Sequence, residues 1–390
     1  MNLFPLRGSQ DTKMTCSLPQ EILDLIIDHL HDEPNALKSC SIVTKAWLYR
    51  TRTHLFNHVK FSPASRHVSQ WKETFPDPAN SPAHYTRTLS INYPKLITPA
   101  DVDTLLTFCG VSHLHVDTGV WYDQRFSVVQ LHGFSPTVKS LHLSFTHLLS
   151  SEIFGLVCSF PLLKDLSLTC TSHRKRDGAW TSPSTSPRLT GSLELSMDGG
   201  IQSTTRQLLG LPNGLHFKNI AVRWVKLEDV GSTMDLVSSC SDTLKCLDVA
   251  NCLIGMFSWR VYLFLTQIRI EGPETASLDL SEATKLERVA FLCKDPNVQW
   301  IVTTLLTTGT KNLQSVSITL SHRVILRALT VESIHQGWLD LDRLLVQFWT
   351  SHSLRLKLMY EWIETGKDLN EAVGLVLPEL TRRGIVDVVK

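Results

Sequence analysis

An apolar doublet recurs along most of this chain at intervals of 21 to 27 residues. Each doublet consists of two apolar residues that flank one residue, which is usually polar or small. The doublets are Leu89/Ile91, Leu114/Val116, Leu141/Leu143, Leu166/Leu168, Leu193/Leu195, Ile220/Val222, Leu247/Val249, Ile268/Ile270, Val289/Phe291 and Val316/Ile318. A fixed period of this length is typical of a solenoid, in which each repeat buries its apolar side chains only by stacking on its neighbours.

The spacing within each repeat predicts a short strand. In eight of the ten repeats an apolar residue also stands three positions before the doublet, as in Leu163 and Leu244. Because side chains alternate along a strand, both members of a doublet face the same side, and successive strands can stack as a parallel sheet. The stretches between doublets, such as SSEIFGLVCSF and VQWIVTTLLTT, suit return helices. The expected fold class is therefore α/β, with a curved horseshoe over residues 85–325.

This pattern resembles a divergent leucine-rich repeat. Residues 244–254, LKCLDVANCLI, match its longer form with Cys252 at the buried turn position, whereas most other repeats lack an asparagine or cysteine there. Because most repeats lack these residues, we expect an irregular array.

A different pattern occupies residues 17–57. Ser17 and Gln20 have the spacing of a helix capping box, and Pro19 suits a first helical turn. An apolar stripe at helical spacing follows, and a second periodic run leads to Trp47. We expect two or three short helices. A unit of about 40 residues rarely buries enough apolar surface by itself, so part of its apolar face needs the rest of the chain or a partner.

The residues of this unit resemble the F-box, in particular fungal F-box-like proteins. The resemblance is in LPQEI at 18–22, DHL at 28–30 and CSIVTKAW at 40–47. It implies docking on the Skp adaptor of a cullin-RING ubiquitin ligase. The residues that it assigns to adaptor binding are Leu18, Pro19, Ile22, Ile26, Leu30, Cys40, Val43 and Trp47.

These patterns divide the chain into five parts. We expect a flexible tail over residues 1–16, the F-box-like helical domain over 17–57, and a proline-rich linker or first edge repeat over 58–84. The solenoid then covers 85–325. After it, residues 326–390 read as helix, strand, helix and strand, and we interpret them as a C-terminal cap, since the ends of a solenoid must be covered.

Composition excludes several classes of function. A net charge of +1 provides no field for nucleic acid or an anionic membrane, and the apolar runs are too short to cross a bilayer. Nine cysteines without a CxxC pair suit reduced thiols in the cytoplasm or nucleus. Motifs for nucleotide binding, serine hydrolysis and zinc peptidases are absent. His115 and His142 occupy equivalent positions, but we interpret them as polar rungs of the sheet. We expect no enzyme, cofactor or metal.

The concave face of the sheet is the expected target-binding surface. Side chains that alternate with the doublets point to it, and their mixed charge suits protein recognition. The residues chosen on this basis are His142, Asp165, Glu194, Arg223, Asp248, Arg269, Glu271 and Arg288. The leading hypothesis is a substrate-recognition subunit of an SCF-type ubiquitin ligase that joins the Skp adaptor to an unidentified target protein. The alternative is a leucine-rich-repeat interaction scaffold without a ligase.

Overall fold

A single parallel sheet joins the described strands from His58 to Val389. The computed structural model describes residues 18–62, 68–92, 99–117, 128–134, 136–145, 150–170, 185–197, 201–225, 229–251, 278–293, 298–308, 312–321, 332–352, 355–361 and 369–389. Within these ranges, 12 strands hydrogen-bond in chain order from β1 to β12, and every pairing is parallel. The architecture is that of an α/β solenoid, in which each strand pairs with the strands just before and after it in the chain.

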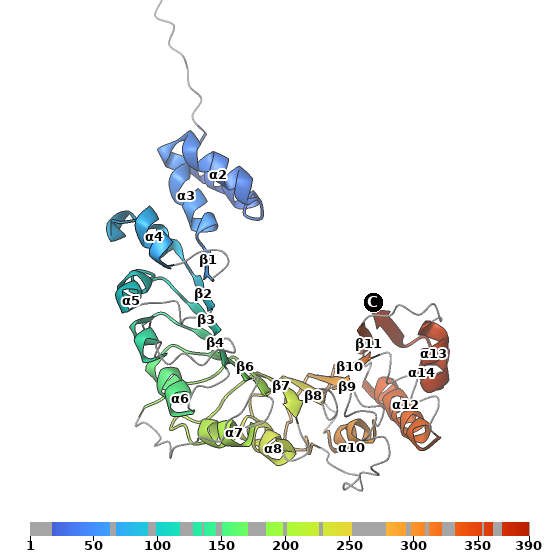
Figure 1. The fold of residues 1–390 in the computed structure, drawn as a ribbon. Coiled ribbons are helices and arrows are strands. Elements are labelled where there is room, and N and C mark those ends of the chain that lie inside the picture. Colours follow the sequence, from blue (N-terminus) through green and yellow to red (C-terminus); the bar gives the residue numbers. More distant parts are fainter. Residues whose placement is uncertain are drawn as a thin grey trace, which may run out of the picture.

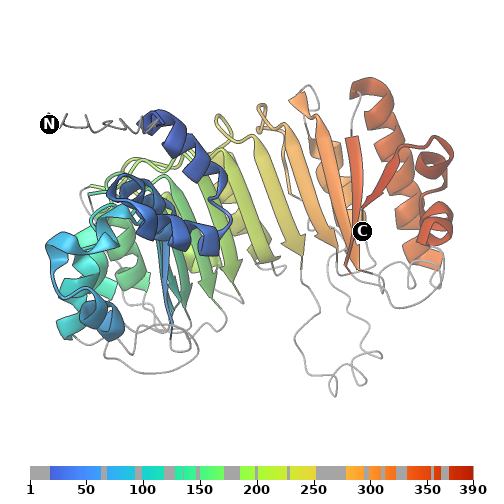
Figure 2. The ribbon, with the colours of Figure 1, turned by 90° about the horizontal axis from the view of Figure 1, so that it is seen from above.

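The strands are short and similar in length. They are β1 (His58–Phe61), β2 (Thr88–Asn92), β3 (His113–Asp117), β4 (Ser140–Phe145), β5 (Asp165–Cys170), β6 (Ser192–Met197), β7 (Asn219–Val225), β8 (Cys246–Asn251), β9 (Arg288–Cys293), β10 (Ser315–Ser321), β11 (Arg355–Glu361) and β12 (Val386–Val389). Seen from above, they lie side by side as one continuous curved sheet (Figure 2).

The helices lie on the outer side of the arc and the strands line its inner side (Figure 1). The outer helices are α4 (Val68–Thr74), α5 (Pro99–Leu106), α6 (Ser150–Ser159), α7 (Ile201–Leu209), α8 (Val230–Ser239), α10 (Gln299–Thr307), α12 (Glu332–His352), α13 (Leu369–Val376) and α14 (Pro378–Arg382), with 3-10 turns η1 (Pro78–Asn80), η2 (Pro82–Tyr85) and η4 (Val128–Phe134). None of the described helices is both long and apolar enough to span a bilayer.

The predicted doublets form the core. Nine of the ten lie on described strands, and their side chains are buried and in register, so that Leu141 stands between Leu114 and Leu166. On β4, β5 and β6 buried side chains alternate with half-buried ones along the entire strand. This alternation puts an aliphatic ladder between sheet and helices and leaves the polar residues on the inner side of the arc.

The prediction that Ile268/Ile270 contributes a strand between those at Leu247 and Val289 is wrong. The doublet lies outside the described residues, but β8 pairs directly with β9, with Leu247 opposite Val289. No strand stands between them. The two spacings of 21 residues, from Leu247 to Ile268 and from Ile268 to Val289, therefore form one long interval between neighbouring strands. The period alone does not reveal this.

Residues 58–84 contribute the first repeat of the sheet. Val59 on β1 is in register with Leu89 on β2, and both side chains are buried. Trp71 on α4 is only 4% exposed, and its ring centroid lies 4.9 to 6.0 Å from those of four phenylalanines. The prolines at 78 and 82 begin 3-10 turns that carry Ala83 into the core. The described residues of 58–84 are therefore packed as part of the array.

The C-terminal region also extends the sheet. It contains helix, strand, helices and strand in the predicted order, but β10 pairs with β11 and β11 with β12, so that these strands continue the same ladder. The period fades here because α12 is a helix of 21 residues, more than twice the length of any other described outer helix. The expected separate cap is thus two longer repeats.

Three helices precede the sheet. They are α1 (Gln20–His29), α2 (Pro34–Val43) and α3 (Lys45–Leu55). They stand at the β1 end of the arc (Figure 1), and α3 leads into β1 after only Phe56 and Asn57. The start of α1 differs from the predicted capping box: its N-cap is Pro19, without a side-chain cap, and Ser17 lies outside the described residues.

Candidate protein-binding surfaces

The helix α1 has two apolar sides. At about 100° per residue, Leu23, Ile27 and Leu30 fall together on one side, and Ile22 and Ile26 on another. Ile27 is fully buried, and Leu23 and Leu30 are half-buried. The second side is open, because Ile22 and Ile26 are 42% and 43% exposed. The helical unit thus uses one side of α1 for its own core and leaves the other facing solvent.

A network of ion pairs links α1 to α3. Both carboxylate oxygens of Asp28 accept hydrogen bonds from Arg50, each at 2.6 Å, and Oδ1 also lies 2.7 Å from Nε2 of His54. The Arg50 hydrogen bond is the main reason why the pKa of Asp28 falls to about 2. At the other end of α1, Nε2 of Gln20 donates to the carbonyl of Ala46. The start of α1 therefore lies beside the junction of α2 and α3.

This junction carries further exposed apolar residues. Ile42 is 86% exposed and Val43 is also exposed, and both lie in the last turn of α2. We give the name open apolar face to the exposed apolar residues on the outer side of α1 and at the end of α2. Its residues are Leu18, Ile22, Leu25, Ile26, Ile42 and Val43. Exposed aliphatic side chains grouped in this way mark a site of protein contact.

The residues assigned to adaptor binding do not all share this face. Leu18, Pro19, Ile22, Ile26 and Val43 are exposed. In contrast, Leu30, Cys40 and Trp47 are half-buried within the unit. The assignment missed Leu25 and Ile42. Helical spacing alone marks Leu25, since it belongs to the same stripe as Ile22, whereas only the packing of α2 shows that Ile42 points outward.

The inner surface of the sheet consists of rows of residues in register. The middle row runs through Ser90, His115, His142, Ser167, Glu194, Ala221, Asp248, Ala290 and Ser317. The row nearer the start of the strands includes Ser192, Asn219, Cys246, Arg288 and Ser315. Neighbouring side chains within a row are about 5 Å apart, one strand spacing, so any large partner touches several at once.

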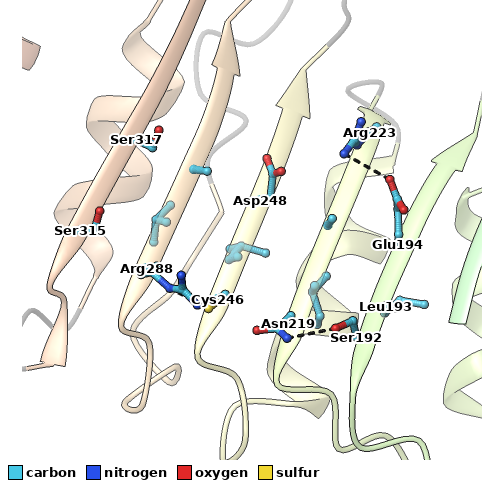
Figure 3. A pocket seen from close by; sticks show the side chains of 15 residues that line it. Ser192, Leu193, Glu194, Asn219, Arg223, Cys246, Asp248, Arg288, Ser315 and Ser317 are labelled. Atoms are coloured by element: carbon cyan, nitrogen blue, oxygen red, sulfur yellow. Dashed lines mark hydrogen bonds and ion pairs between the residues drawn. The ribbon is translucent and has the colours of Figure 1, made fainter. Parts of the chain in front are cut away.

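A hollow of about 530 Å³ lies in this surface over β6 to β10 (Figure 3). We call it the charged hollow. Its polar lining residues are Ser192, Glu194, Asn219, Arg223, Cys246, Asp248, Arg288, Ser315 and Ser317. Small side chains make room for it, since Ala221 and Ala290 stand on either side of Asp248 in the middle row.

Four of the eight residues assigned to target binding line the charged hollow, namely Glu194, Arg223, Asp248 and Arg288. Two others lie elsewhere on the sheet. His142 is in the middle row on β4, and Asp165 on β5 accepts a hydrogen bond of 2.7 Å from the amide of Ser192. This bond gives Asp165 a structural role between strands. Arg269 and Glu271 lie outside the described residues.

His115 and His142 are neighbours, as their spacing predicts. Their ring centroids are 4.1 Å apart on β3 and β4. Burial lowers the pKa of both rings, and for His115 the proximity of His142 adds to this effect. Within the part of the chain that the structure describes, no group of three or more histidine, cysteine or acidic side chains is arranged to hold a metal ion.

No protein-family model matches the chain. No curated protein matches it either. Among solved structures, the chain is similar to one from the crystal structure of the Rad7 and Elc1 complex in yeast. The two share 12% identity over 95% of this chain and 92% of the other, with a TM-score of 0.38. A likeness at this TM-score carries no argument about function.

Proposed function

We propose that this protein is the substrate-recognition subunit of an SCF-type ubiquitin ligase. In this proposal the open apolar face docks on the Skp adaptor, and the inner surface of the sheet captures the target protein. The chain itself supplies no catalytic group, and it raises the local concentration of the target near the rest of the ligase. We also propose that it acts in the cytoplasm or nucleus, where cysteines remain reduced.

The observation that carries this proposal is the open apolar face. Leu25 is 55% exposed and Ile42 is 86% exposed, although a unit of this size has few apolar side chains to spare. Full exposure of such a residue costs about 1.5–3 kcal/mol relative to burial, so a covering partner gains the fraction that corresponds to the exposed part of each side chain. The same face includes Leu18 and Ile22, which belong to the stretch that resembles the F-box.

The direct test is binding to the purified Skp adaptor. In the variant Ile22→Asp/Ile26→Asp, an apolar contact surface receives two charges that would be buried without partners. We expect at least a 100-fold loss of affinity in calorimetry, with an unchanged far-UV circular dichroism spectrum because both side chains are exposed.

A matched control is Leu306→Asp on α10, which is 65% exposed and lies on the outer side of the arc. This variant should bind the adaptor as the wild type does. The proposal fails if the wild type does not bind the adaptor, or if the double variant binds it with unchanged affinity.

The packing of the helical unit on the helical layer of the first repeat favours a second candidate function, an interaction scaffold without a ligase. Tyr49 on α3 meets Tyr85 edge-on with centroids 5.3 Å apart, and Phe56 packs on Trp71. These contacts suit a built-in end cap of the array. A protein that binds a partner through its inner surface but has no affinity for the adaptor would be such a scaffold.

A further inference from the structure

Among the residues that the structure describes, two ionic side chains of the charged hollow have no ionic partner at hydrogen-bond distance. Glu194 and Arg223 pair with each other at 3.2 Å, and Oγ of Ser167 also donates to Glu194. Asp248 and Arg288 differ from them. Among the described residues, Asp248 makes no hydrogen bond, and Arg288 only donates from Nε to Sγ of Cys246 at 3.2 Å.

The neighbours of these two residues keep them accessible. In its row Asp248 stands between Ala221 and Ala290, and Arg288 stands between Cys246 and Ser315. Small side chains on both adjacent strands cannot reach over the charged groups. Figure 3 shows Asp248 and Arg288 on neighbouring strands and at different heights along them, with Arg288 directed toward Cys246.

The surroundings of Asp248 make an ionic partner valuable. The carboxyl is half-buried, and burial raises its pKa, while Arg223 opposes that rise and Glu194 adds to it. A carboxylate with reduced hydration gains more from a cation than one in bulk water does. A direct ion pair between Asp248 and Arg288 would require Arg288 to give up its hydrogen bond to Cys246.

Arg288 offers unused hydrogen-bond donors to the hollow. The terminal nitrogens of Arg288 have no acceptor among the described residues, and the guanidinium geometry suits a carboxylate that binds through both oxygens. The hydroxyl groups of Ser315 and Ser317 come from the next strand and line the same hollow.

We propose that the charged hollow holds a polypeptide segment of the target, with an acidic side chain against Arg288 and a basic side chain against Asp248. This inference rests on the proposed function, in which the inner surface captures the target. A volume of about 530 Å³ accommodates several side chains at once. The two ionic contacts lie on adjacent strands, so they select the order in which the segment presents its acid and its base.

The test uses a display library of random 12-residue peptides, selected on the full-length protein. We expect enriched peptides to share an acidic and a basic residue at a constant spacing. For a selected peptide, Arg288→Glu and Asp248→Lys should each weaken binding at least tenfold in fluorescence anisotropy. Reversing the acidic residue of the peptide to lysine should restore binding to Arg288→Glu but not to Asp248→Lys.

Arg343→Glu is the matched control, because the Arg343 side chain is 65% exposed on the outer helix α12. It should bind the peptide as the wild type does. Asp248→Asn, which keeps the shape of the side chain, guards against loss of fold in Asp248→Lys and should also bind more weakly. The inference is overturned if no peptides with paired charges are enriched, or if the two reversals leave binding unchanged.

The two proposals can fail separately. The variant Ile22→Asp/Ile26→Asp is included in the peptide assay and should bind the peptide normally. Peptide binding by a protein that lacks adaptor affinity would contradict the ligase and leave the hollow as a binding site. Adaptor affinity without selection of charged peptides would contradict only the inference about the hollow.

Discussion

Replacement of Trp71 by alanine should release the first strands of the sheet. Trp71 joins the helical unit to the array, because its ring packs against Phe56, which follows α3, and against Phe61 on β1 and Phe108. Its Nε1 also donates to Oγ of Ser81 at 3.3 Å. No other described side chain makes ring contacts with all three of Phe56, Phe61 and Phe108.

The structure sets the size of the effect. At 4% exposure, Trp71 buries about 200 Å² of apolar surface, which corresponds to about 5 kcal/mol at 25 cal/mol per Å². Residual burial in the unfolded chain reduces this by 10–40%, so we expect a loss of about 4 kcal/mol, within the usual range of about 3–5 kcal/mol for tryptophan to alanine in a core.

Hydrogen exchange is the suitable assay, since solenoids open locally and need not unfold in one step. A loss of about 4 kcal/mol is about three decades in the opening equilibrium of the β1 and β2 amides. Trp71→Phe retains a ring but loses the bond to Ser81, and it should cost about one decade. The control Trp349→Ala, at a position that is 38% exposed on α12, should leave β1 and β2 unchanged.

The reasoning would be refuted if β1 and β2 in Trp71→Ala stayed within tenfold of the wild type. Other contacts would then hold the helical unit on the first repeat, and the layer formed by α4 would not be needed for the stability of β1 and β2.

Two further predictions concern buried or paired carboxylates. Asp28→Asn should lower the stability of the helical unit by about 1 kcal/mol, a modest amount because the Asp28 side chain is a third exposed. The pKa of Asp28 in the fold, about 2, lies below the usual value of about 3.9, so its contribution is complete above about pH 4 and is lost as the pH falls through 2. Chemical unfolding between pH 5 and 2 should therefore show a steeper loss for the wild type than for Asp28→Asn, and equal slopes would contradict this account. Asp342→Ala should cost about 2–3 kcal/mol, because this side chain is 1% exposed and accepts the amides of Glu379 at 2.8 Å and Leu380 at 3.0 Å. Asp342→Asn, which retains one acceptor, should lose about half as much in thermal unfolding, and an unchanged melting temperature in Asp342→Ala would show that α14 does not depend on this cap.

Several features of the fold follow from local pattern. The doublets predict strands at the right residues because alternation and burial obey the same two-residue period, as Leu141 and Leu143 illustrate. The apolar stripe that predicts α1 is also a local pattern, because its residues recur at helical spacing. Ile268/Ile270 shows the limit of this reasoning, since a doublet at the right spacing is still not a rung when β8 pairs directly with β9.

The candidate sites depended more on tertiary contacts. The sequence selected Glu194, Arg223, Asp248 and Arg288 as inward-facing, but it did not show that Glu194 and Arg223 neutralise each other. Glu194 lies on β6 and Arg223 on the adjacent strand β7, and only the register between these strands brings the two side chains together. Likewise, the link from Asp28 to Arg50 depends on the angle between α1 and α3.

The sequence by itself determined the repeating unit, because the period of apolar residues decides which side chains need cover and in what secondary structure. The tertiary structure decided where the array begins and ends, which apolar residues of the helical unit remain in solvent, and which charges remain without an ionic partner. Those outcomes depend on contacts between residues far apart in the chain, and free energies of packing and pairing are set by geometry that no local pattern contains.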